Sequence, residues 1–229
     1  MPLKGLTWFR LKEHIRKTFL IYVAGIIIMC VLTNLIFTMT RPSVPAEKEV
    51  LVYLVDTYSE ADGADAGYIA ANALEHGRQS DETLELVRFE SIAYQGIEDY
   101  ASPMLLTARM SVGDGDVYLC SPDGFDYASK AGMPVPLDDY LADGWLSELN
   151  PETIEWTDPE TGETFIAGVC LKDLPQLYDV FRFDNEDAYL MMATNSSNLE
   201  TAFDVVEDII YSLMEGDIHA PADSEEPAA

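Results

Sequence analysis

The chain has 229 residues, of which 41 are acidic and 13 are basic, so its formal net charge at pH 7 is −28. The charge is divided unevenly. Residues 1–41 hold six basic groups and one acid, a net of +5, whereas residues 42–229 hold seven basic and forty acidic groups, a net of −33. So acidic a region excludes nucleic acid as its partner, because nucleic-acid binding needs Lys and Arg against the phosphates.

The first predicted element is a helix that crosses a membrane. Residues 18–39, TFLIYVAGIIIMCVLTNLIFTM, contain no Asp, Glu, Lys or Arg. Twenty-two residues at about 1.5 Å each span about 33 Å, close to the ~30 Å hydrocarbon core of a bilayer. We therefore expect a transmembrane helix over 18–40 that contacts the lipid bilayer through residues 18–39.

The flanking charges predict the orientation of this helix. Five basic residues precede it, so the positive-inside rule places the amphipathic basic segment 1–17 in the cytoplasm and the C-terminal domain outside the cell membrane. A cleaved signal peptide usually has a shorter apolar region of about 7–15 residues, so a retained single-pass anchor is favoured. The sequence VPA at 44–46 leaves cleavage open as the alternative.

Strands and helices are expected to alternate in the first half of the domain that follows. A Pro-containing, extended linker over 41–49 leads into an extracellular domain over 50–216. The patterns predict a strand buried on both faces at 50–56, a helix at 62–79, a strand near a sheet edge at 82–91, and a helix at 96–113 that Pro103 kinks or restarts.

The second half continues the alternation. The patterns predict a strand at 116–122, a short helix at 123–132, an irregular segment with one helical turn at 133–146, a hairpin at 154–171 with its turn at 158–162, a strand at 187–194, a helix at 195–216, and a disordered acidic tail at 217–229. This order predicts an α/β fold with a mixed, mostly parallel sheet and helices on both faces.

The sequence contains no motif that predicts catalysis or metal binding. His14, His76 and His219 lack metal-ligand spacing, and the sequence contains no HExxH, CxxC, GxSxG or P-loop motif. We therefore predict no catalytic residue, no metal site and no cofactor, and a protein that is not an enzyme. Cys120 and Cys170 lie in runs typical of buried strands, which favours free thiols over a disulfide bridge.

Four residues are candidates for binding a ligand. In open α/β sheets, ligands gather at the carboxyl ends of the strands. Those ends are DTYS (56–59) and CSPDG (120–124), and they offer Thr57, Tyr58, Ser121 and Asp123 to a small polar ligand such as a sugar or a peptide. The alternative is that these residues serve as ordinary turn and helix-cap residues.

Several stretches together resemble a known family. They are the opening β-α-β unit, GDGDVYLCSPDGFDYASKAGMPVPLDDYL (113–141), ETFIAGVCL (163–171) and AYLMMATNSSNLETAFDVVEDII (188–210). They look like the extracellular solute-binding proteins of bacterial ABC importers, which have the two-lobed type II architecture. The resemblance implies that the chain begins to leave lobe 1 on the strand at 163–171 and returns at 188. Only the 16 residues 172–187 lie where that family builds its second lobe.

The resemblance and the anchor together predict the function. We expect a membrane-anchored extracellular module, similar to lobe 1 of a solute-binding protein, that binds a small polar ligand or acts as an accessory and is not an enzyme. The alternative is a structural or interaction protein that docks on another envelope or transporter component.

Overall fold

The computed structural model describes residues 19, 21, 23–34, 44–61, 63–113, 115–159, 161–184 and 187–218, and the chain divides into two compact units, Met1–Ser43 and Val44–Ala229. In the first unit, residues 23–34 are helical. No helix among the described residues combines the length and the apolarity needed to cross a membrane. The segment predicted as cytoplasmic, 1–17, and residues 18, 20, 22 and 35–40 of the predicted span lie outside the described residues.

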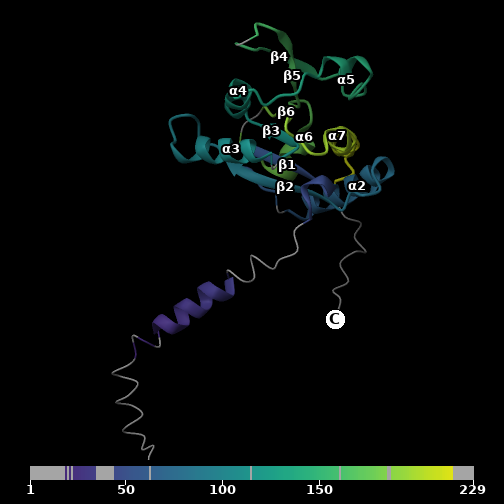
Figure 1. The fold of residues 1–229 in the computed structure, drawn as a ribbon. Coiled ribbons are helices and arrows are strands. Elements are labelled where there is room, and N and C mark those ends of the chain that lie inside the picture. Colours follow the sequence, from purple (N-terminus) through teal and green to yellow (C-terminus); the bar gives the residue numbers. More distant parts are fainter. Residues whose placement is uncertain are drawn as a thin grey trace, which may run out of the picture. The chain divides into compact units, whose positions relative to one another are not determined.

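The second unit is built on one six-stranded sheet (Figure 1). Its strands are β1 (Glu49–Asp56), β2 (Leu86–Ala93), β3 (Val117–Cys120), β4 (Glu152–Thr157), β5 (Thr164–Cys170) and β6 (Tyr189–Met192), in the spatial order β2-β1-β3-β6-β5-β4. All positions of β1 after Glu49 are buried, as its nearly continuous apolar run predicts for a strand covered on both faces.

The sheet is mixed, which confirms the α/β expectation, but it is not mostly parallel. β1 pairs in parallel with β2 and β3, whereas the pairs β3–β6, β5–β6 and β4–β5 are antiparallel. The connections explain the difference. Parallel neighbours need a long crossover, which α2 and α3 supply, while the hairpin turn and the short segment after β5 return the chain in the opposite direction.

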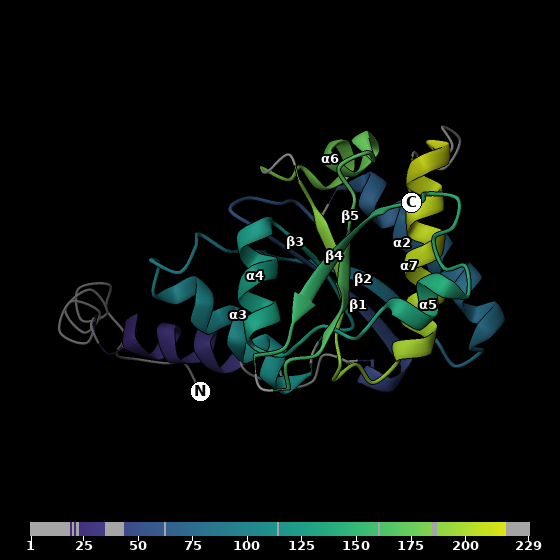
Figure 2. The ribbon, with the colours of Figure 1, turned by 90° about the horizontal axis from the view of Figure 1, so that it is seen from above.

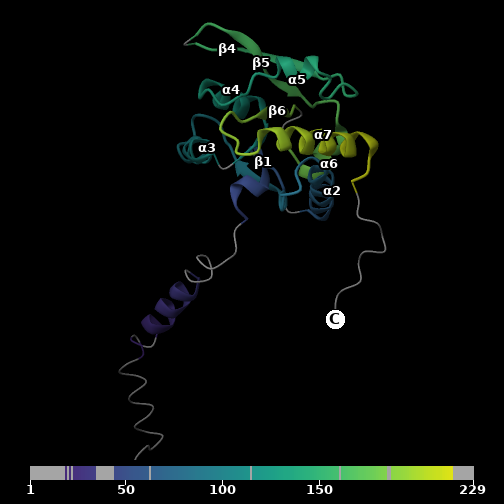
Figure 3. The same ribbon diagram turned by 45° about the vertical axis from the view of Figure 1, so that its right-hand side comes forward.

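Helices cover both faces of the sheet. They are α2 (Ala64–Ser80), α3 (Ala101–Val112), α4 (Pro122–Lys130), α5 (Asp138–Ala142), α6 (Pro175–Phe181) and α7 (Leu199–Glu215), and a 3-10 turn, η1 (Ala46–Lys48), precedes β1. α3 and α4 lie on one side of the sheet, and α2 and α7 lie beside each other on the other side (Figure 2). The helix α6 contacts both α2 and α7 (Figure 3).

Two apolar clusters fill the two sides of the sheet. The larger one packs Val52 and Leu54 of β1 under α2, α6 and α7, and the smaller one packs Tyr53 and Val55 under α3 and α4. Successive strand side chains point to opposite faces, so β1 alone supplies side chains to both clusters.

Several boundaries differ from the sequence expectation. The segment 96–100 is a turn, and α3 begins only at Ala101, so Pro103 lies in the first helical turn, where its missing N–H has no partner to lose. The linker 41–49 contains a 3-10 turn at Ala46–Lys48, and its last residue, Glu49, is already the first residue of β1. The described start of the predicted tail is packed, because Ile218 is buried.

One helix was not expected at all. Residues Pro175–Phe181, between β5 and β6, form α6, and the buried side chains of Leu177, Val180 and Phe181 belong to the larger cluster. Pro175 stands in the first turn, where proline favours a helix start, but seven residues are too few for helical periodicity to be recognised.

A glycine inside β5 lies in tight packing. A Cβ added to Gly168 would lie 2.5 Å from Cε2 of Phe125 and 2.6 Å from the carbonyl oxygen of Leu190. The first contact is with a buried ring and the second with backbone, so neither neighbour gives way easily.

We expect Gly168→Ala to lower the free energy of unfolding by about 1–3 kcal/mol, because overpacking in a tight core costs that much. Gly67→Ala in α2 is the matched control. No atom lies within 4 Å of its added Cβ, and alanine favours a helix by about 1 kcal/mol over glycine. Urea unfolding followed by circular dichroism measures both; equal stabilities for the two variants would contradict the packing described for β5.

Candidate functional site

The four candidate ligand residues lie in two loops that leave the same edge of the sheet. Thr57 and Tyr58 follow β1, while Ser121 and Asp123 stand at the start of α4, just after β3. β1 and β3 are parallel neighbours, with Val55 opposite Cys120, so their carboxyl ends adjoin. The structure therefore brings the two predicted strand ends together, and the four side chains differ in what they do there.

Asp56 connects two segments of the chain at the carboxyl ends of the strands. Its side chain is fully buried, and its two carboxylate oxygens accept hydrogen bonds from the backbone N–H of Thr57 at 2.7 Å and of Asp184 at 2.6 Å. A buried carboxylate is tolerated where it accepts such bonds. Asp56 thereby joins the loop after β1 to the segment after α6.

Further bonds attach the loop after β1 to the same segment. The N–H of Asp184 also lies 3.2 Å from the carbonyl oxygen of Tyr58, and the N–H of Glu60 donates to the carbonyl of Phe181 at 2.8 Å. The Glu60 carboxylate pairs with Arg182 at 2.6 Å. Thr57 is exposed and the Tyr58 side chain is 57% exposed, so both present their side chains outward from a fixed loop.

Ser121 serves as a helix cap. It is buried, its N–H donates to the carbonyl of Val55 at 2.7 Å, and its Oγ accepts the N–H of Gly124 at 3.4 Å. Ser121 is therefore a helix-cap residue, the alternative stated above, and its Oγ is already used as a hydrogen-bond acceptor within the protein.

Asp123 differs from Ser121, because it is exposed in the first turn of α4. It lies near Tyr94, whose ring is 5.8 Å from that of Tyr127. The pKa of the Tyr94 phenol is raised, mainly by burial and to a smaller extent by Tyr127 and Asp123.

The thiol at this end of the sheet lies in surroundings that favour its protonated form. Cys120 is fully buried, and burial together with the nearby Asp56 raises the pKa of its thiol, which keeps it protonated at neutral pH. Reactive cysteines need the opposite surroundings, with partial exposure and positive charge. Cys170 is also buried, and both thiols are free. Among the described residues, no group of three His, Cys, Asp or Glu side chains is arranged to hold a metal ion.

A buried aspartate, Asp116, lies just before β3, at the opposite end of the strands. Its carboxylate accepts the N–H of Leu51 at 2.9 Å and the hydroxyl of Ser196 at 2.6 Å. The Asn198 amide donates to the carbonyls of Ala46 and Glu49. Burial raises the pKa of the Asp116 carboxyl. These residues hold the start of β1 and α7 together.

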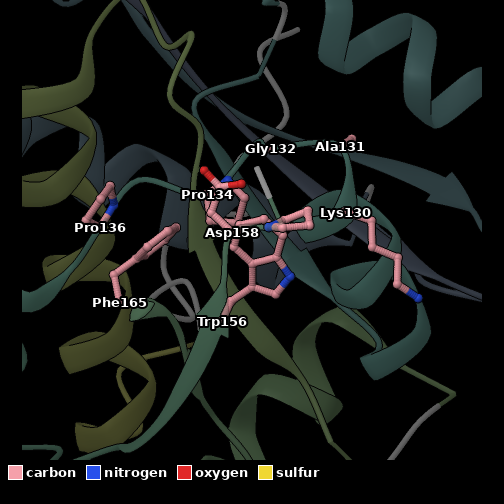
Figure 4. A pocket seen from close by; sticks show the side chains of 9 residues that line it. Lys130, Ala131, Gly132, Pro134, Pro136, Trp156, Asp158 and Phe165 are labelled. Carbon is pink, nitrogen blue, oxygen red and sulfur yellow. The ribbon is translucent and has the colours of Figure 1, made fainter. Parts of the chain in front are cut away.

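A separate cavity of about 430 Å³ lies between the end of α4 and the β4–β5 hairpin (Figure 4). Aromatic and proline side chains line most of it, with one residue of each charge; the lining residues are Lys130, Ala131, Gly132, Pro134, Pro136, Trp156, Asp158, Pro159 and Phe165. The Trp156 and Phe165 rings meet edge-on at 5.8 Å. The Lys130 ammonium is paired with Asp126 at 2.5 Å. We call this cavity the Trp156 groove. The sequence did not indicate it, because its lining comes from three separate segments.

A comparison of the chain with known proteins gave no match among family models, curated proteins or solved structures. The resemblance to solute-binding proteins therefore stays a prediction.

Replacing Asp56 by Asn tests the organisation of the edge. The amide keeps one acceptor oxygen but turns an NH₂ group toward a backbone N–H, so we expect a loss of about 1–3 kcal/mol in the free energy of unfolding. Asp123→Asn removes an exposed carboxylate next to the same edge, and we expect a change within about 0.5 kcal/mol. Thermal unfolding of both variants at neutral pH measures the difference; an Asp56→Asn protein as stable as the native chain would contradict the role given to this carboxylate.

Proposed function

We propose that the chain is a membrane-anchored, non-enzymatic interaction module, whose extracellular α/β domain docks on another envelope or transporter component. The observation that carries this proposal is that the described residues between β5 and β6 pack against the domain itself. At the point where the resemblance would insert a second lobe, the N–H of Leu171 donates to the carbonyl of Ala188 at 2.8 Å.

The described residues between these two, 172–184 and 187, include several that pack against the domain. Leu174, Leu177 and Phe181 are at most 2% exposed, and Asp184 is bonded to Asp56 at the end of β1. Two-lobed binding proteins trap a ligand by closing one lobe over the other. Here the chain between β5 and β6, where the resemblance would place the second lobe, packs in the core of the same domain. This favours docking on a partner protein over the trapping of a ligand between two lobes.

The anchor rests on the apolar segment at the N-terminus. Ile26, Ile27, Ile28 and Met29 are each at least 57% exposed in the described helical stretch. Four consecutive helical positions point to all sides of a helix, so apolar side chains surround it, as suits a lipid environment. The five basic residues before residue 18 support a cytoplasmic N-terminus.

Membrane extraction tests the anchor. Full-length chain expressed in bacteria is expected to stay with the membranes in alkaline carbonate, whereas a chain that lacks residues 1–43 is released, because only those residues offer a long uncharged segment. Release of the full-length chain under the same conditions would contradict the proposal.

Photo-crosslinking in membranes tests the docking. A photoreactive phenylalanine analogue replaces Tyr58 at the strand ends or Trp156 in the groove, and in the control it replaces Val112 at the end of α3, which is 78% exposed. We expect a discrete adduct with one other polypeptide from Tyr58 or Trp156 and none from Val112. Only uncrosslinked chain from both test positions would overturn the docking proposal.

Small-ligand binding is the second candidate, favoured by the exposed side chains of Thr57, Tyr58 and Asp123 at the strand ends. Thermal unfolding of the full chain with sugars, amino acids and short peptides tests it. A concentration-dependent rise in midpoint that Tyr58→Ala abolishes and Val112→Ala leaves intact would support binding. No rise with any of these compounds would remove this candidate.

A further inference from the structure

The strand β2 is one edge of the sheet, and nothing in the described part of the chain pairs with its outer side (Figure 1). In a parallel pair, the N–H and C=O groups of alternate residues point toward the neighbouring strand. The N–H of Tyr94 donates to the carbonyl of Asp56 at 2.8 Å, so even-numbered residues here face β1. Val87, Phe89 and Ser91 therefore direct their backbone groups outward, available to another strand.

In one antiparallel register, the charged side chains of β2 would lie opposite side chains of opposite charge on a second copy of β2. If a second copy of β2 pairs antiparallel with the first around a two-fold axis at Phe89, Val87 lies opposite Ser91 of the second copy. Arg88 then lies opposite Glu90 of the second copy, and the symmetry repeats that contact. The outward backbone groups of the odd-numbered residues meet in this register, and the Arg88–Glu90 positions become the closely spaced non-hydrogen-bonded pairs.

The charged side chains of this edge are partly open to solvent. The Arg88 side chain is 40% exposed and the Glu90 side chain 30%. Within one chain the Arg88 guanidinium pairs with both Glu49 and Glu90, and Arg109 lies 4.0 Å from Glu90. A guanidinium has five N–H donors, so Arg88 can keep these contacts and still reach a third carboxylate.

The opposite face of the same edge carries an apolar groove of about 430 Å³. It lies between α2 and β2 and is lined mostly by small or apolar residues: Ala61, Gly63, Gly67, Ala70, Ala71, Leu74, Leu86, Val87, Arg88 and Phe89. A two-fold axis perpendicular to the sheet brings the second copy's α2 to the same face, where the small side chains permit close approach. Antiparallel pairing at the edge and apolar contact at the groove are therefore compatible in one assembly.

We propose that β2 is a homodimer interface, in which two copies of this chain pair antiparallel around Phe89 with reciprocal Arg88–Glu90 contacts. The pairing extends the six-stranded sheet across the two copies and removes an open edge that otherwise exposes backbone groups. A two-fold contact uses the same patch twice, so self-complementary charges are what it requires. This inference is independent of the proposed docking function, which needs a different partner and a different surface.

Charge reversal in the full-length chain, purified in detergent, tests the proposal. Multi-detector light scattering at about 150 mM salt gives the mass of the protein component, since at this ionic strength the repulsion between two acidic domains is screened beyond about 8 Å. We expect a reversible dimer of the native chain. Arg88→Glu or Glu90→Arg alone is expected to raise the dissociation constant about 30-fold or more, because each places like charges opposite each other twice.

Mixing the two variants decides the register. In a mixed pair the two carboxylates of the Arg88→Glu copy face the two guanidinium groups of the Glu90→Arg copy, so an equimolar mixture is expected to dimerise again. The double variant is expected to dimerise as the native chain does, for the same reason. Glu155→Lys on β4, at the other edge of the sheet, is the control and leaves the dimer unchanged.

Circular dichroism confirms that each variant is folded, and the Glu90→Arg chain, which keeps the Arg88–Glu49 pair, serves if the Arg88→Glu chain is not. A native chain that stays monomeric at about 0.2 mM would overturn the proposal. So would a dimer that neither charge reversal weakens, since the contact would then lie elsewhere, for example in residues 1–43. Loss of the dimer in both single variants without recovery in the mixture or the double variant would reject the register around Phe89.

Discussion

The burial of β1 on both faces is the constraint on which the domain depends. Its seven consecutive buried residues supply side chains to the clusters on both sides of the sheet, and it holds β2 and β3 in parallel on its two edges. A strand in this position has no face free for a ligand. Whatever the domain recognises must be met at the ends of the strands, at the sheet edges or on the outer helices.

The buried carboxylate of Asp56 links the centre of the sheet to its surface. It ends β1 and accepts backbone N–H groups from the next residue and from Asp184, 128 residues later in the chain. Through this contact the loop after β1 and the segment after α6 form one structure at the strand ends. The described part of the same segment lies between β5 and β6 in the chain, so the central strand β1 holds the connection between those two strands.

The sequence predicted those elements whose signal is local. The uninterrupted apolar run at 50–56 indicated a strand covered on both sides, and the helical spacing of Phe203, Val206, Ile210 and Leu213 indicated α7; both are present and buried. The strand ends at Thr57 and Ser121 were correctly placed at one edge. The helix α6 was missed because seven residues carry no readable period, and the direction of β6 was missed because a short buried strand reads the same in parallel and antiparallel sheets.

The roles that depend on distant contacts could not be predicted. Asp56 accepts a hydrogen bond from Asp184, 128 residues away, and Asp116 accepts one from Ser196, 80 residues away. Nothing near either aspartate in the sequence indicates that its side chain is buried and bonded to a distant segment. The Trp156 groove is assembled from the end of α4, a proline-rich segment and a hairpin. Ser121 is different, because a serine just before a helix suggests a cap by itself, and the cap alternative describes its contacts in the structure.

The central claim is that α6 and the residues after it, up to Asp184, are an integral part of this domain. Hydrogen–deuterium exchange of the full-length chain tests it most directly, because protection reports the free energy needed to open each hydrogen bond. The account predicts that the amides of Leu177, Arg182 and Asp184, whose N–H groups are bonded within this segment or to Asp56, exchange about as slowly as those of β5. Exchange of these amides at the rate of an unstructured peptide would contradict it.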